Sequence, residues 1–250
     1  MKPLLSDYRL YLVTDSRLHK GHSVLEQVGL ALEGGIRIIQ LREKELPATD
    51  FIKLASEALK LTRARNAFLI INDSVEVVQS IGADGLHLGQ EDMAVTEARK
   101  IVGDGVVIGV SVKTVEEARQ AERDGADYVA VNGVFPTTTK EDLGYLPGLD
   151  GVRKISQATA LPVVGIGGIN LQNCCSVVEA GAHGIAVVTA ITLSDDILAT
   201  CRTFFERMAK PINRKWQRAR PLDDKSEIAN CGTETTGCKP QTGAKDVLSL

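Results

Sequence analysis

The feature of this sequence that most restricts its fold is a repeat of short apolar runs separated by longer amphipathic stretches. Eight such runs, most of them rich in Val and Ile, occupy residues 8–14, 36–42, 68–72, 85–88, 106–110, 128–131, 162–165 and 184–188. Nearly continuous apolar runs of this length are typical of parallel strands that are covered on both faces. The stretches between them, for example residues 23–32, 51–65 and 115–123, have the pattern of surface helices.

A second repeat lies just before several of these runs. Four expected helices end in a pair of small residues, at Gly34-Gly35, Gly82-Ala83, Gly125-Ala126 and Gly181-Ala182. Glycine can adopt the left-handed conformation that ends a helix. A repeated order of helix, glycine turn and buried strand predicts parallel βα units. Eight units in about 210 residues predict an α/β fold of the closed (β/α)8 TIM barrel type, with an open doubly wound sheet as the alternative.

Local signals mark the helix starts and the end of the barrel. Capping-box spacing occurs at Thr114 with Glu117 and at Asp73 with Glu76. Pro211 is expected to stop the last helix, and residues 211–250 are polar and lack a sustained apolar period. We therefore predict a catalytic barrel domain over residues 1–210 and a mostly disordered tail over 211–250. The basic start of the tail is interpreted as a solvated helix end running into a linker, with contact to an acidic partner as the alternative.

Composition excludes several classes of protein. The net charge of −3 and the pI near 5.9 argue against binding of nucleic acid or anionic lipid through bulk charge. No apolar run approaches the roughly 20 residues of a membrane span, and Asp7 and Arg9 interrupt the place where a signal peptide needs its apolar core. The five cysteines contain no CxxC spacing, so neither a disulfide framework nor a zinc site is indicated. Cytoplasmic localisation is expected.

The polar residues of the expected barrel gather at one end. The carboxyl ends of barrel strands and the loops that follow them form the active-site face of this fold. Seven of the eight expected strands are followed there by polar or glycine residues. These are Gln40, Arg42 and Lys44; Asn72 and Asp73; Gln90, Glu91 and Asp92; Ser111; Thr137, Thr138, Thr139 and Lys140; Gly165, Gly167 and Gly168; and Thr189 after Val188.

These residue types suggest a phosphorylated ligand. Arg42, Lys44 and Lys140 are cations that can hold phosphate oxygens. Asp73 and Asp92 are hard oxygen donors, and Mg²⁺ is typically held by one or two carboxylates together with substrate phosphates. The glycines after the seventh strand and the amides after the eighth form the usual phosphate site of the fold. The sequence thus predicts a diphosphate with Mg²⁺ on one side of the rim and a monophosphate on the other.

Each of these residues also has a structural interpretation. Arg42 and Lys44 could pair with neighbouring glutamates on the surface, and Asp73 or Asp92 could cap a helix. The Ser111 hydroxyl could bond to backbone at a strand end. The histidine in the fourth strand, His87, is expected to point inward, where a core or supporting role is favoured over catalysis. The ligand hypothesis depends on the convergence of all these residues at one rim.

Several segments, taken in order, resemble one known family. QLREK, IIND, DGLHLGQEDM, VFPTTTK, PVVGIGGI and VVTAI together resemble thiamine phosphate synthase over about residues 8–208, and each segment lies at an expected strand end. The resemblance implies a (β/α)8 barrel that joins 4-amino-5-hydroxymethyl-2-methylpyrimidine diphosphate to a thiazole phosphate. It also implies one Mg²⁺ per site and release of pyrophosphate.

The resemblance assigns roles to individual positions. Gln40, Leu41, Arg42, Glu43, Lys44 and Asn72 match the pyrimidine diphosphate site; Asp73 and Asp92 match the Mg²⁺ ligands; Ser111 and Lys140 match further diphosphate contacts; and Thr137, Thr138, Thr139, Gly168, Val188 and Thr189 match the thiazole phosphate site. Departures from the family pattern are Asn132-Gly133, where a Gly-Pro-like pair is frequent, and threonine at 138 and 189, where serine is common.

These assignments predict a transferase that works by electrostatics. Arg42, Lys44, Lys140 and Ser111 would carry the catalysis, because no Cys/His or Ser/His pair on the rim suggests a covalent intermediate. The expected partners are the two small-molecule substrates, with no nucleic acid and no membrane; a homo-oligomer is left open. The alternatives are a thiazole tautomerase-like isomerase, a non-catalytic binder of thiamine precursors, and a sugar-phosphate isomerase in which Glu91 would have to be the base.

Overall fold

Eight parallel strands close into a barrel in the computed structural model, which describes residues 2–137 and 144–209. Neighbours in the sequence are neighbours in the sheet, and pairing of β1 with β8 closes it, with Tyr11 opposite Ala186. The strands are β1 (Leu10–Val13), β2 (Ile38–Leu41), β3 (Phe68–Asn72), β4 (Gly85–Leu88), β5 (Val107–Val112), β6 (Tyr128–Asn132), β7 (Val163–Ile166) and β8 (Gly184–Val187). The predicted barrel is confirmed, and the open sheet is wrong.

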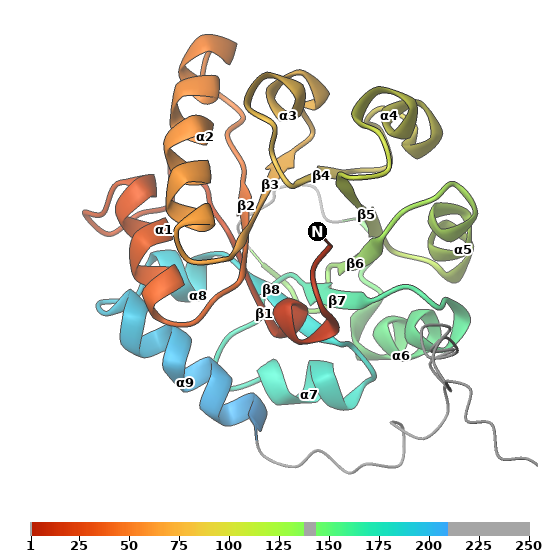
Figure 1. Cartoon of the computed structure of the whole chain (residues 1–250). Coiled ribbons are helices and arrows are strands. Elements are labelled where there is room, and N and C mark those ends of the chain that lie inside the picture. The colour runs from red at the N-terminus through yellow and green to blue at the C-terminus, as the bar shows by residue number, and fades with distance from the viewer. Residues whose placement is uncertain (1, 138–143, 210–250) are drawn as a thin grey trace, which may run out of the picture. The chain divides into compact units, whose positions relative to one another are not determined.

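Helices surround the strands, as Figure 1 shows. A short 3-10 helix, η1 (Leu5–Arg9), precedes β1. The α-helices are α1 (Val24–Glu33), α2 (Ala48–Arg63), α3 (Val75–Ile81), α4 (Val95–Val102), α5 (Val115–Arg123), α6 (Gly148–Ala158), α7 (Cys174–Glu179), α8 (Thr189–Thr192) and α9 (Ile197–Ala209). Within the described ranges no helix is long and apolar enough to cross a bilayer. The predicted division at residue 210, and the predicted disorder of 211–250, lie outside the described residues.

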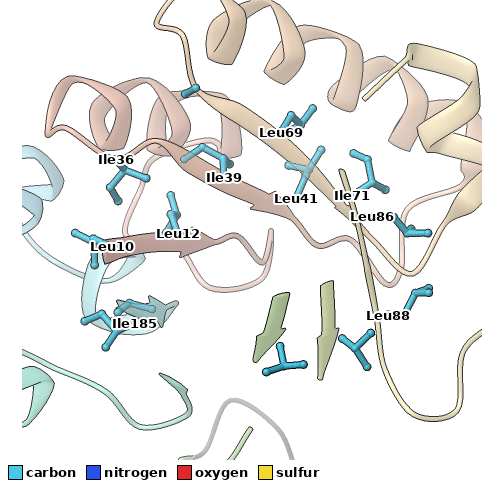
Figure 2. Packing of buried hydrophobic residues seen from close by; sticks show 14 of the residues in the cluster. Leu10, Leu12, Ile36, Ile39, Leu41, Leu69, Ile71, Leu86, Leu88 and Ile185 are labelled. Carbon is cyan, nitrogen blue, oxygen red and sulfur yellow. The ribbon is translucent and has the colours of Figure 1, made fainter. Parts of the chain in front are cut away.

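The alternation of side chains along each strand builds two apolar layers. Outward residues such as Leu12, Ile39 and Leu41 pack against the helices in one continuous core (Figure 2). Inward residues form a second cluster in the barrel interior, which includes Tyr11 and Tyr128. Because both faces of every strand are covered, the strands read as unbroken apolar runs in the sequence.

The predicted glycine turns are confirmed by the backbone. Gly35, Gly82, Gly125 and Gly181 all have positive φ, between +65° and +111°. Gly82 is the left-handed C-cap of α3, and its N–H donates to the Val78 carbonyl. These turns return the chain from each helix to the amino end of the next strand.

One predicted capping box is confirmed and the other is wrong. Thr114 and Glu117 cap α5 reciprocally. At α3 the N-cap is Ser74, whose hydroxyl accepts from the Val77 N–H, and Asp73 lies one residue earlier with φ of +64°. The carboxylate of Asp73 is therefore not used to cap the helix.

Candidate active site

A pocket opens at the carboxyl ends of the strands, where the sequence predicted the rim. All eight strands or the loops that follow them contribute to it. Of the predicted residues, those that line the pocket are Gln40, Arg42, Asn72, Ser111, Thr137, Gly167, Gly168, Val188 and Thr189. Lys44, Asp73 and Asp92 are not among the residues that line it. Further lining residues include Tyr11, Asp15, His87 and Asn132. The structure thus brings together side chains that the sequence separates by more than 100 positions.

Arg42 is fixed by the loop after β1. Its Nη1 donates to Asp15 Oδ2 at 2.6 Å, and its backbone N–H donates to the Thr14 hydroxyl at 3.2 Å. Asp15 also accepts from the side chain and the backbone N–H of Arg17. The guanidinium of Arg42 therefore reaches the pocket wall in one held orientation. Sequence reasoning missed Asp15, although it follows the first strand at the same rim as the predicted residues.

Asp15 is a carboxylate held in its charged form. Burial alone raises the pKa of this carboxyl, but the hydrogen bonds from Arg17 and the charges of Arg17 and Arg42 together hold it below its ordinary value. The side chain is buried, whereas Arg17 is half exposed. The buried Asp15 carboxylate thus pairs with two guanidinium groups, and Arg17 pairs with Glu45 as well.

The other predicted residues of the QLREK segment lie in different surroundings. Leu41 is fully buried in the core between strands and helices, so its side chain faces away from the pocket (Figure 2). Glu43 is half-buried beside Ser16, and burial raises the pKa of its carboxyl. Lys44 is half exposed, and its Nζ lies 3.3 Å from Asp73 Oδ2.

The two predicted metal ligands lie together. Asp73 is close enough to Asp92 for a hydrogen bond between the carboxyl groups, and Lys44 faces the same carboxyl. Burial, then the hydrogen bond and the charge of Asp92, raise the pKa of Asp73. Asp92 Oδ2 accepts from the Gly89 N–H at 2.6 Å, and α4 begins after Ala94, so Asp92 does not cap that helix. Two carboxyl groups that repel each other are well suited to share a cation.

This pair fits the way Mg²⁺ is held in phosphate-binding sites. The part of the chain that the structure describes has no cluster of three or more His, Cys, Asp or Glu side chains arranged to hold a metal ion. Mg²⁺ does not require one, because substrate phosphates and water usually supply most of its ligands. Asp73 and Asp92 would thus provide the protein's share of such a site.

A chain of hydrogen bonds crosses the barrel along the pocket wall. Gln40 Nε2 donates to the Tyr11 hydroxyl at 2.6 Å, and the hydroxyls of Tyr11 and Tyr128 are 2.8 Å apart. His87 bridges the Tyr128 hydroxyl, at 2.8 Å from Nδ1, and the Ser111 hydroxyl, at 3.0 Å from Nε2. The supporting role predicted for His87 agrees with this position, whereas the two tyrosines were not singled out because each looks like an ordinary core residue.

The ends of β7 and β8 supply another part of the pocket wall, which includes a glycine pair. Gly167 and Gly168 have φ of +110° and +61°, which side chains other than glycine rarely adopt. A Cβ at Gly168 would lie 2.4 Å from the Pro136 carbonyl oxygen, so this loop packs tightly against the segment after β6. Thr189 begins α8 directly after β8. Thr138, Thr139 and Lys140 lie outside the described residues, so their predicted roles stay predictions.

Fold and site together define the class of the protein. A closed (β/α)8 barrel whose mouth carries Arg42, Asp15 and a tight glycine loop has the arrangement that phosphate-binding enzymes of this fold use. Residues 10–191 match the family model described as thiamine monophosphate synthase. The chain therefore belongs to the thiamine monophosphate synthase family.

Individual relatives agree with this assignment. A thiamine-phosphate synthase of Moorella thermoacetica is 45% identical over 202 residues, which cover 81% of this chain and 96% of the relative. That of Chloroflexus aurantiacus is 46% identical over 196 residues, covering 78% and 90%. Among solved structures, a thiamine phosphate pyrophosphorylase from Pyrococcus furiosus matches with a TM-score of 0.76 and 37% identity, covering 83% of this chain and 98% of that one.

Proposed function

We propose that this chain is a thiamine phosphate synthase, a transferase that joins 4-amino-5-hydroxymethyl-2-methylpyrimidine diphosphate to a thiazole phosphate and releases pyrophosphate. The observation that carries the proposal is the pocket that unites Arg42 with the Gly167-Gly168 loop. Asp73 of the Asp73–Asp92 pair follows Asn72, which lines this pocket, and Lys44 contacts Asp73. A reaction between two phosphorylated substrates needs two anion sites within one pocket. Family membership and the names of the relatives support the same reaction.

The diphosphate is proposed to bind on the side of β2, β3 and β4. Arg42 can donate two parallel N–H groups to phosphoryl oxygens, and Lys44 adds a point charge. Asp73 and Asp92 would hold one Mg²⁺, which, when bound, neutralises charge that develops on the departing pyrophosphate. Lys140, predicted from sequence, would add a third cation from the loop after β6. Together these groups stabilise the leaving group as the bond to carbon breaks.

Gln40, Asn72 and Ser111 are proposed to orient the pyrimidine, since all three line the same pocket as Arg42. The electron-rich aminopyrimidine can stabilise positive charge on its CH2 group as pyrophosphate leaves. The thiazole phosphate would bind through Thr137, Gly168, Val188 and Thr189, at the ends of β6, β7 and β8, and the predicted roles of Thr138 and Thr139 belong to the same site. From there the thiazole nitrogen attacks the carbon, and holding both reactants in line lowers the barrier by several kcal/mol.

The decisive experiment mixes the purified chain with both substrates and Mg²⁺ and measures pyrophosphate and thiamine phosphate. The proposal predicts both products in equal amounts, and none when either substrate is omitted. A chemical change of thiazole phosphate alone would indicate an isomerase. Binding of both substrates without turnover would indicate a binding protein. Either of the last two results contradicts the proposal.

A further inference from the structure

The hydrogen-bond chain of Gln40, Tyr11, Tyr128, His87 and Ser111 can form only because residue 109 is a glycine. His87 on β4 lies opposite Gly109 on β5, and Gly109 lies opposite Tyr128 on β6. A Cβ at Gly109 would lie 2.0 Å from Cζ of Tyr128. Because Gly109 has no side chain, the Tyr128 ring can cross β5 at this position and place its hydroxyl 2.8 Å from His87 Nδ1.

Four members of this hydrogen-bond chain line the pocket, and Tyr128, in its middle, is enclosed in the barrel interior. Tyr11 and Tyr128 are almost completely buried, and the rings of His87 and Tyr128 lie 5.6 Å apart between their centres. Gln40 and Ser111, the two end members, both line the pocket. A change in the hydrogen bonding of the buried members is therefore transmitted to two groups that face the ligand.

The donors and acceptors in the hydrogen-bond chain can be assigned by counting its hydrogens. Burial raises the pKa of Tyr11 and of Tyr128, so each hydroxyl keeps its one hydrogen. Gln40 donates to Tyr11, and the remaining hydrogen-bond neighbour of the Tyr11 hydroxyl is the Tyr128 hydroxyl. The Tyr11 hydrogen must therefore point to Tyr128, because a buried hydroxyl hydrogen without an acceptor is costly. Tyr128 then has to donate its own hydrogen to His87 Nδ1.

The direction of the hydrogen bonds also determines which ring nitrogen of His87 carries the hydrogen. Because Nδ1 of His87 accepts from Tyr128, the ring is neutral and carries its hydrogen on Nε2. That nitrogen lies 3.0 Å from Ser111 Oγ and donates to it. The hydrogen of the Ser111 hydroxyl is then left to point into the pocket. In the opposite direction, Ser111 would donate to His87 and the Tyr11 hydrogen would be left without an acceptor.

We propose that Tyr128 and His87 are positioning residues that force the Ser111 hydroxyl to act as a hydrogen-bond donor toward the ligand. At the other end, an amide N–H of Gln40 donates to Tyr11, which leaves its carbonyl oxygen as an acceptor for the ligand. The proposal rests on the proposed function, since the aminopyrimidine diphosphate has both acceptor atoms for Ser111 and a donor amino group for Gln40. The buried chain thus selects a ligand with this donor and acceptor pattern.

The first arm of the test reads the histidine ring directly and needs no substrate. The full chain is labelled with ¹⁵N-histidine, and the His87 signals are assigned by comparison with His87→Gln. The proposal predicts a neutral ring protonated on Nε2 in the unaltered chain, because Tyr128 occupies Nδ1. A ring protonated on Nδ1, or a charged ring, overturns the proposal. This arm remains informative even if the chain releases no pyrophosphate, which would refute the proposed function separately.

The second arm uses a matched pair of variants. Tyr128→Phe removes the donor to His87 and keeps the ring, and Tyr8→Phe removes a hydroxyl outside the chain from a buried ring 5.2 Å away. We expect Tyr128→Phe to give a mixture of the two neutral ring forms of His87 and to lower kcat about tenfold, the effect of one lost hydrogen bond. The KM for thiazole phosphate should stay unchanged, and Tyr8→Phe should behave like the unaltered chain. A kcat for Tyr128→Phe within about twofold of the unaltered chain overturns the proposal.

Discussion

Asp15 Oδ2 and Arg42 Nη1 lie 2.6 Å apart in a pair almost withdrawn from solvent, with side-chain exposures of 5% and 13%. The pair joins the loop after β1 to the end of β2, and it directs the guanidinium along the pocket wall. A charge-assisted hydrogen bond of this length fixes orientation as well as charge. Arg42 thus enters the proposed reaction already positioned, which is the condition for electrostatic stabilisation without reorganisation.

Replacement of Arg42 tests its proposed role on the leaving group. We expect Arg42→Ala to lower kcat/KM at least about a hundredfold, the scale for loss of one charge-stabilising group. Steady-state pyrophosphate release measures the effect. Arg37→Ala is the matched control, because Arg37 is exposed just before the same strand and its side chain donates to the Arg65 carbonyl, away from the pocket residues. A fall of less than about threefold in Arg42→Ala would remove Arg42 from the mechanism.

Removal of the Asp15 charge should lower stability in a pH-dependent way. The pKa of Asp15 is held below its ordinary value of 3.8 in the folded chain, so its contribution is present at neutral pH and is lost as the pH falls through the folded pKa. We expect Asp15→Asn to unfold more easily at pH 7 by about 1–3 kcal/mol. Thermal unfolding at pH 7 and below pH 4 measures this. The two proteins should converge in acid, and an equal gap at both pH values would contradict the interpretation.

The carboxylate pair should control the demand for Mg²⁺. We expect Asp92→Ala to raise the Mg²⁺ concentration for half-maximal pyrophosphate release by about tenfold or more, because one protein ligand is lost. Asp104→Ala, an exposed carboxylate before β5, serves as the control. An Mg²⁺ titration of Asp92→Ala that superimposes on that of the unaltered chain would count against the pair as the metal site.

Substitution in the glycine loop should affect thiazole phosphate more than the pyrimidine diphosphate. In Gly168→Ala the new Cβ would meet the Pro136 carbonyl and Phe135, so the loop must shift. We expect the KM for thiazole phosphate to rise about tenfold or more, with a smaller effect on the pyrimidine diphosphate. Gly82→Ala is the control, because its φ of +65° is close to the +61° of Gly168 and nothing lies within 4 Å of its Cβ. Equal effects of the two substitutions on KM would mean that backbone strain, and not the loop, is responsible.

The sequence predicted the barrel because its main signals are local. Buried parallel strands leave apolar runs, and Gly82 or Gly125 can be recognised from the turn that follows a helix. The rim could be predicted for the same reason, since a residue's place after a strand decides which end of the barrel it occupies.

Contacts between distant strands could not be predicted in this way. The partnership of Asp15 with Arg42, and the approach of Tyr128 to His87 across Gly109, depend on strand register and ring placement. Capping was misjudged at Asp73 because Ser74, one residue later, also fits the role of N-cap and has it in the structure. Leu41 shares its segment with pocket residues, but the strand alternation turns its side chain into the core.

The most direct test of the account is a crystal structure of the chain with Mg²⁺, inorganic pyrophosphate and thiazole phosphate bound together. We predict pyrophosphate within hydrogen-bond distance of Arg42 with the metal ion on Asp73 and Asp92, and thiazole phosphate seated on the loop at Gly168 and on Thr189. Both anions on the same side of the mouth, or a metal ion bound away from the two carboxylates, would contradict the central claim that one pocket holds the two substrates in line.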